Sequence, residues 1–178
     1  MNHTEIKRAR NGRMTASRAE LNPTRNDLDP ATRRSIVKLL NERLADAVDL
    51  YSQVKQAHWN VKGPTFIALH ELFDKLAEEI EEYVDTIAER AVQLGGTAMG
   101  TTRLAAANSS LPEYPHDITS GADHVNAVAN ALSLFGAQVR AASDSADDLG
   151  DAGTADLFTQ VSRGVDKYLW FVEAHAQA

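Results

Sequence analysis

Apolar residues recur every three or four positions in four long segments of this 178-residue chain, the spacing that places side chains on one face of an α-helix. The predicted helices run from Pro30 to about His58 and over residues 65–94, 120–146 and 154–174. Residues 97–118 contain prolines and small residues, and we expect a long crossover there with one short helix at 101–107. No strand pattern competes with these segments, so the sequence predicts an all-α fold.

Residues that start and stop helices support these boundaries. Asp29-Pro30 places an N-cap acceptor ahead of a proline at the first helical position, and Gly95-Gly96 follows the second helix. The predicted apolar stripe of the second helix consists of Phe66, Leu69, Phe73, Leu76, Ile80, Val84, Ile87, Ala91 and Leu94. Two helical hairpins joined by one long crossover form a ferritin-like four-helix bundle.

The first part of the chain differs from the rest. Residues 1–28 lack apolar periodicity and are rich in Asn, Arg, Thr and Ser, so we expect a disordered arm ahead of a domain of residues 29–178. Residues 1–25 carry six basic side chains against two glutamates, within a chain of net charge −7. A basic arm on an acidic body attracts polyanions through the arm alone.

Composition excludes several classes of protein. The chain has no cysteine, so disulfides and thiolate metal sites are excluded. No apolar run approaches the roughly 20 residues of a membrane span, and no nucleotide-binding or acyl-transfer motif is present. We therefore expect a cytoplasmic protein with no membrane partner.

Two pairs of metal-binding residue types lie on the second predicted helix. His70 and Asp74 are four residues apart, as are Asp85 and Glu89, so each pair projects from one face of the helix. The eleven residues between Asp74 and Asp85 span roughly 16 Å of helix. One ion, with ligand bonds of about 2.0–2.2 Å, cannot join both pairs within one chain.

A two-fold axis would bring the pairs together. Positions 70 and 89, and positions 74 and 85, share one midpoint between residues 79 and 80. An antiparallel copy of the helix would therefore set His70 and Asp74 of one chain against Glu89 and Asp85 of the other, in two equivalent sites. The alternative interpretation is that these four side chains belong to an ordinary solvated helix face and bind no metal. Carboxylates with one or two imidazoles suit Fe(II), Zn(II) or Mn(II), and zinc would occupy the site without turnover.

At these residues the chain resembles a known family. The segments KQAHWNVKGPTFIALHELFDKL (55–76), VDTIAERAVQLGG (84–96) and DKYLWFVE (166–173) resemble the Dps family, the miniferritins. The resemblance covers residues 30–175 and implies a hollow dodecamer that oxidises Fe(II) with hydrogen peroxide and stores ferric mineral. It also implies a metal site with His58, His70 and Asp74 from one subunit and Asp85 and Glu89 from its partner. Without the resemblance, His58 would be interpreted as a core histidine.

The family often binds DNA through a basic N-terminal arm, without sequence specificity. The arm residues that we expect to contact DNA are Lys7, Arg8, Arg10, Arg13 and Arg18. We therefore expect association with the nucleoid. Two alternatives stay open: a miniferritin that does not bind DNA, and a nucleoid-compacting structural protein whose metal site is vestigial or holds zinc.

An acidic run near the last interhelix turn has two interpretations. Its members are Asp144, Asp147, Asp148, Asp151 and Asp156. They form either a solvated turn with helix N-caps, such as Asp151, or a pore at a three-fold axis through which iron enters. His3, His116, His124 and His175 have no partner spacing, and we expect them on the surface.

Overall fold

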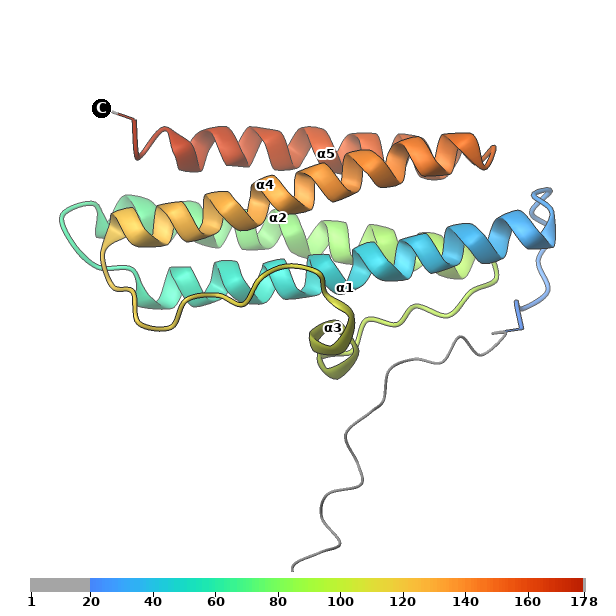
Figure 1. The fold of residues 1–178 in the computed structure, drawn as a ribbon, viewed down its shortest axis with the longest axis horizontal. Coiled ribbons are helices and arrows are strands. Elements are labelled where there is room, and N and C mark those ends of the chain that lie inside the picture. Colours follow the sequence, from blue (N-terminus) through green and yellow to red (C-terminus); the bar gives the residue numbers. More distant parts are fainter. Residues whose placement is uncertain (1–19, 178) are drawn as a thin grey trace, which may run out of the picture.

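The computed structural model describes residues 20–177, and these form an all-helical bundle (Figure 1). The helices are α1 (Pro30–Asn60), α2 (Phe66–Gln93), α3 (Thr102–Asn108), α4 (Gly121–Asp148) and α5 (Ala152–Glu173). Each predicted helix is confirmed, with both ends within two residues of the predicted ones. The described part of the chain contains no strand, only an isolated bridge between Lys62 and Ser120.

The bundle consists of two hairpins, α1–α2 and α4–α5, which pack together through α1 against α4 and α2 against α5. The crossover between the hairpins runs alongside α1 and carries α3 against it (Figure 1). Apolar side chains from all four long helices form one core cluster. This is the predicted ferritin-like arrangement, in which burial of the four stripes supplies the main stabilising free energy.

Local chemistry fixes the helix ends. The Asp29 carboxylate accepts hydrogen bonds from the backbone N–H groups of Ala31 (2.8 Å) and Thr32 (3.1 Å), so it is the predicted N-cap of α1. Gly95 has a φ of 85°, which closes the end of α2 in a conformation that favours glycine.

A buried carboxylate holds the crossover against α1. Asp46 is fully buried, lies 2.9 Å from the Arg43 guanidinium, and accepts hydrogen bonds from the backbone N–H (2.7 Å) and hydroxyl (3.0 Å) of Ser110. Nearer the start of the crossover, the Asn41 side chain of α1 accepts a hydrogen bond from the Met99 N–H (2.7 Å) and donates to the Thr97 carbonyl (3.0 Å). Side chains of α1 therefore supply hydrogen-bond partners to backbone groups of the crossover, which have none within a helix or strand.

Residues 20–28, which we assigned to the arm, lie against the bundle. The Asn22 N–H donates to the Gly95 carbonyl at 2.7 Å, and Leu21 and Leu28 pack on the core. Residues 1–19 lie outside the described residues, and the boundary at residue 29 stays a prediction.

Two sequence-based expectations were wrong. Phe66, predicted in the apolar stripe of α2, is 42 % exposed because it is the first residue of the helix and lies beyond the core. His124, expected on the surface, is buried, and its Nδ1 lies 2.6 Å from the Tyr114 hydroxyl. Burial lowers the pKa of the His124 imidazole, and the Asn60 carbonyl and Asp123 partly offset that effect.

Among residues 20–177, no helix is both long enough and apolar enough to cross a membrane.

Replacing Asp46 tests the anchoring of the crossover. We expect Asp46→Ala to lower the free energy of unfolding by about 3–5 kcal/mol, because it leaves Arg43 and the Ser110 N–H without their buried acceptor. Denaturant unfolding measures the loss. Asp27→Ala, at an exposed position, is the control, and an equal effect of the two substitutions would contradict the anchoring role.

Candidate metal centre

Two of the predicted ligands, His58 and His70, form a crossed pair where α1 ends and α2 begins. The Nδ1 atom of His58 lies 2.8 Å from the His70 carbonyl oxygen, and the Nδ1 atom of His70 lies 2.9 Å from the His58 carbonyl oxygen. Their rings stack with centroids 3.8 Å apart and planes 19° from parallel. Each histidine therefore positions the other.

The crossed contacts determine the tautomer of both rings. A carbonyl oxygen only accepts hydrogen bonds, so each Nδ1 must carry the proton. In the neutral imidazole, Nε2 is then left with its lone pair free, which is the form that binds a metal ion. Backbone carbonyls orient metal-binding histidines in the same manner in many metalloproteins.

The α1–α2 turn makes this pairing possible. Gly63 has a φ of 110°, a left-handed conformation that a side chain would disfavour, and its carbonyl accepts a hydrogen bond from the Phe66 N–H at 3.0 Å. The tight turn returns the chain so that His58, at the end of α1, faces the second turn of α2.

The third predicted ligand of this half-site is next to the pair. An Asp74 oxygen lies 3.8 Å from Nε2 of His58 and 2.6 Å from the Lys55 ammonium. The hydrogen bond from Lys55 lowers the pKa of the Asp74 carboxyl, against a smaller opposing effect of desolvation. The carboxylate is thus held in its anionic, metal-binding form.

The sequence analysis did not identify Lys55 as part of the site. The available signal was its spacing, because a residue three positions before His58 lies on the same face of a helix. The Lys55 ammonium lies 2.6 Å from an Asp74 oxygen, so a cation that bound this carboxylate would have to displace it.

Asp85 and Glu89 lie farther along α2 and are exposed. The rise of the helix separates Asp74 from Asp85 by roughly 16 Å. Among residues 20–177 of one chain, no set of three histidine or carboxylate side chains is close enough to hold a metal ion. The structure therefore pairs His58 with His70 and places an Asp74 oxygen 3.8 Å from Nε2 of His58, but the three do not form a complete metal-binding group, and Asp85 and Glu89 lie apart from them.

The five aspartates of the acidic run are in two environments. Asp144, Asp147 and Asp148 are exposed near the end of α4, and Asp156 is exposed just after the first turn of α5. Asp151 is buried, because its carboxylate caps α5 through the Thr154 N–H (3.0 Å) and pairs with the Arg90 guanidinium (2.8 Å). Asp151 is therefore the N-cap that one of the two interpretations predicts.

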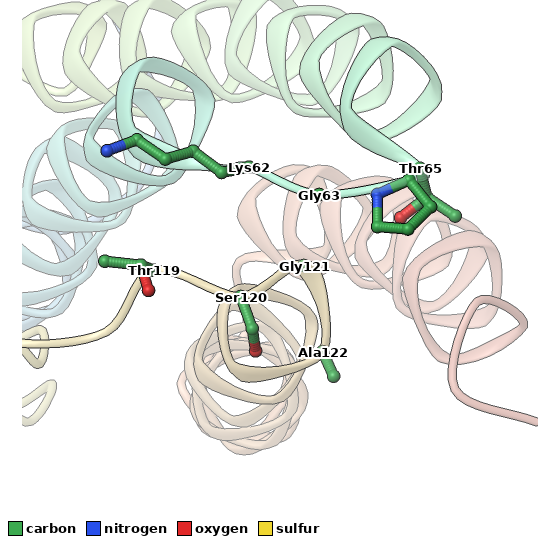
Figure 2. Close-up of a pocket in the computed structure, with 8 residues that line it drawn as sticks. Lys62, Gly63, Thr65, Thr119, Ser120, Gly121 and Ala122 are labelled. Atoms are coloured by element: carbon green, nitrogen blue, oxygen red, sulfur yellow. The ribbon is translucent and has the colours of Figure 1, made fainter.

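Two other candidate regions lie away from the ligands. The five basic residues expected to contact DNA fall within residues 1–19, outside the described residues. A hollow of about 450 Å³ lies where the α1–α2 turn meets the start of α4. Figure 2 shows the residues that line it, 62–65 and 119–122. None of the five predicted metal ligands lines it.

Comparison with known proteins identifies relatives along most of the chain. Residues 37–178 match the ferritin-like domain family. The DNA protection during starvation protein of Agrobacterium fabrum is 46 % identical over 154 residues, which cover 86 % of this chain and 95 % of that protein. DpsC from Streptomyces coelicolor superposes with a TM-score of 0.85 at 32 % identity, covering 90 % of this chain and 94 % of that one. A Dps protein from Bacillus brevis gives a TM-score of 0.78 at 32 % identity, covering 84 % and 99 %.

Replacing Lys55 tests its role as a competing cation. We expect Lys55→Met to bind Co(II) several-fold more tightly at neutral pH, because the ion no longer has to displace the ammonium from Asp74. Calorimetric titration measures the affinity, with Lys75→Met on the exposed surface of α2 as the control. Weaker binding by Lys55→Met would show that the ammonium assists the site.

Proposed function

Because this chain belongs to the Dps family of ferritin-like proteins, we propose that it oxidises Fe(II) with hydrogen peroxide and stores the ferric product. The observation that carries the proposal is the crossed histidine pair, whose two carbonyl contacts leave both Nε2 atoms free as ligands beside the ionised Asp74. Two imidazoles and a carboxylate are a donor set that suits iron in both oxidation states.

The site is completed by a second copy of the chain. His58, His70 and Asp74 form one half, and Asp85 and Glu89 of the partner form the other, across a two-fold axis near residues 79 and 80. This assignment accounts for the distance between the two groups in one chain. It also requires two equivalent sites in each dimer.

Fe(II) and hydrogen peroxide are the substrates. Each Fe(II) ion gives up one electron, and each peroxide takes up two electrons and two protons to yield water. The added carboxylates of the partner offset the charge that iron gains on oxidation, which favours Fe(III) as the bound product. Zinc has no accessible second oxidation state, so at the same ligands it is a non-reactive occupant.

Storage follows from assembly. We propose a hollow dodecamer, with ferric mineral in its cavity and Fe(II) entering through acidic pores at three-fold axes. The exposed carboxylates of Asp144, Asp147, Asp148 and Asp156 support that role. Asp151 is a weaker candidate for a pore residue, because its side chain is already bound to Arg90 and Thr154.

The N-terminal arm supplies a second activity. We propose that Lys7, Arg8, Arg10, Arg13 and Arg18 bind DNA by neutralising phosphates, which places the protein on the nucleoid in the cytoplasm. Many arms on one shell would bind with high avidity even if each contact is weak. The name of the Agrobacterium fabrum relative, DNA protection during starvation protein, agrees with this role.

Subunit complementation tests the shared site. His70→Ala and Asp85→Ala each break a different half, so each variant alone should lose fast Fe(II) oxidation by peroxide. Coexpressed in equal amounts, the two should recover about a quarter of the wild-type rate, because a quarter of randomly assembled sites combine two intact halves. Stopped-flow absorbance of Fe(III) formation measures the rate.

Coexpression of His70→Ala with Asp74→Ala is the matched control. Both substitutions damage the same half, so every site stays broken and no activity should return. Recovery of oxidation in this control, or no recovery when His70→Ala is coexpressed with Asp85→Ala, would refute the two-fold assignment. Unchanged oxidation in the single variants would instead remove these residues from the mechanism.

Neutralising the arm tests DNA binding. We expect replacement of its five named basic residues by glutamine to abolish the shift of linear DNA in gels at low salt, because phosphate contacts supply the affinity. The wild type should lose affinity steeply as salt rises, whereas the variant should show little salt dependence. The variant retains the arm's length, so a shift equal to wild type would assign binding to the body of the protein.

A further inference from the structure

A tyrosine and a histidine form a buried pair where the crossover ends and α4 begins. The Tyr114 hydroxyl lies 2.6 Å from Nδ1 of His124, and the two rings stack with centroids 6.1 Å apart and planes 18° from parallel. Tyr114 is 6 % exposed and His124 is 1 % exposed, so both rings are almost closed off from bulk water. The metal site described above uses neither of them.

The surroundings of His124 determine which atoms of the pair carry protons. The Asn60 carbonyl raises the pKa of the imidazole, as an acceptor beside a ring N–H does, and Nδ1 already faces Tyr114. The proton of the neutral ring is therefore on Nε2, and Nδ1 accepts the hydrogen bond from the phenol. Among residues 20–177, Nε2 has no hydrogen-bond partner of good geometry, so its contact with Asn60 is weak.

Burial gives the pair the protonation states that a proton-coupled redox site needs. It raises the pKa of the Tyr114 phenol and lowers the pKa of the His124 imidazole, so a protonated phenol faces a neutral base. A phenol that loses an electron becomes a strong acid, and a base at hydrogen-bond distance lets the electron and the proton leave together. Nδ1 of His124 is such a base, and the Asn60 carbonyl and Asp123 stabilise the imidazolium that results.

The other tyrosines lack a basic partner of this kind. Among the described residues, the Tyr83 hydroxyl donates to the Glu79 carboxylate at 2.8 Å, and the Tyr168 hydroxyl lies 3.4 Å from a backbone carbonyl. A carboxylate is a weaker base than an imidazole. The Tyr51 hydroxyl makes no hydrogen bond within residues 20–177. Tyr114 is therefore the tyrosine that loses an electron and a proton most easily.

The pair is connected to the histidine half of the metal site. α4 begins at the end of the bundle at which α1 ends and α2 begins (Figure 1). Asn60, whose carbonyl is beside His124, follows His58 by two residues, or two Cα steps of about 3.8 Å. One hydrogen bond, one carbonyl contact and two residues of helix thus connect Tyr114 with His58. A connection this short allows an electron to tunnel between them.

We propose that Tyr114 is a redox-active residue that supplies one electron to hydrogen peroxide when a site holds a single Fe(II) ion, with His124 as the acceptor of its proton. The proposal rests on the iron oxidation proposed above, in which each peroxide takes up two electrons. One Fe(II) ion supplies only one, and one-electron reduction of peroxide releases a hydroxyl radical. The electron from Tyr114 prevents that release.

The proposed step leaves Tyr114 unchanged at its end. Peroxide takes up one electron from Fe(II), one from Tyr114 and two protons from solvent, so its O–O bond breaks and two water molecules form. The phenolic proton moves to Nδ1 of His124, which leaves a neutral phenoxyl radical and an imidazolium. A second Fe(II) ion then returns an electron to the radical, and the proton returns from His124 to the phenol oxygen. Two Fe(II) ions are thus oxidised for each peroxide.

Photochemical oxidation of the iron-free protein tests the pair by itself. A flash-excited ruthenium complex with persulfate removes electrons from the protein, and EPR of frozen samples detects the tyrosyl radical that forms. We expect Tyr114→Phe to lose most of this signal. Tyr83→Phe is the matched control, since it also removes a buried, hydrogen-bonded hydroxyl, and it should keep the signal. Equal signals from the two variants would overturn the proposal.

Two further variants assign the radical and its proton acceptor. A fluorinated tyrosine at position 114 keeps the hydroxyl and the fold, and fluorine hyperfine splitting should appear in the EPR spectrum. An unsplit spectrum would contradict a radical at Tyr114. In His124→Leu, the high-field spectrum should lose the g-value shift that a hydrogen bond to the phenoxyl oxygen causes. A wild-type shift in that variant would overturn the role of His124.

Iron and peroxide test the reaction. With one Fe(II) ion per chain, which is one per proposed site, rapid freeze-quench EPR should show the same radical after peroxide is added. Tyr114→Phe should then release several-fold more hydroxyl radical to a spin trap than either wild type or Tyr83→Phe. Fast iron oxidation with equal release by all three proteins would overturn the proposal and keep the proposed function. Photo-oxidation of Tyr114 in a protein that does not oxidise iron would overturn the proposed function, and the peroxide step with it, but would keep the redox-active pair.

Discussion

The fixed rise of the α-helix is the constraint on which the functional interpretation of this chain depends. Because successive residues advance by about 1.5 Å, two ligand pairs on one straight helix cannot converge on one ion. His70 and Asp74 converge with His58 of α1, while Asp85 and Glu89 stay on the open surface of α2. The proposed function therefore assigns two different half-sites to each chain, each completed by a second copy.

Charge on the exposed surface of α2 is mainly negative. Within one chain, Lys55 compensates Asp74, but the exposed carboxylates farther along the helix face solvent. Bringing two such faces together costs electrostatic free energy, which cations bound at the proposed sites would offset.

Sequence-based predictions succeeded for features that depend on neighbouring residues in the chain and failed for features that depend on tertiary packing. The N-cap Asp29 and the glycine stop after α2 were predictable because capping depends on near neighbours in the chain. The burial of His124 was not, because it depends on Tyr114 of the crossover, whose path no local pattern specifies. Periodicity also placed Phe66 in the core, although its position at the helix end exposes it.

The sequence by itself determined the helices, their all-α arrangement and the shared midpoint of the two ligand pairs, because all three follow from fixed residue spacing along a regular helix. Only the tertiary structure decided which nitrogen of His58 and His70 is protonated, and which cation neutralises Asp74. Those features arise where α1 and α2 meet across a glycine turn. Their chemistry is set by distances between atoms of two helices, which spacing within either helix does not specify.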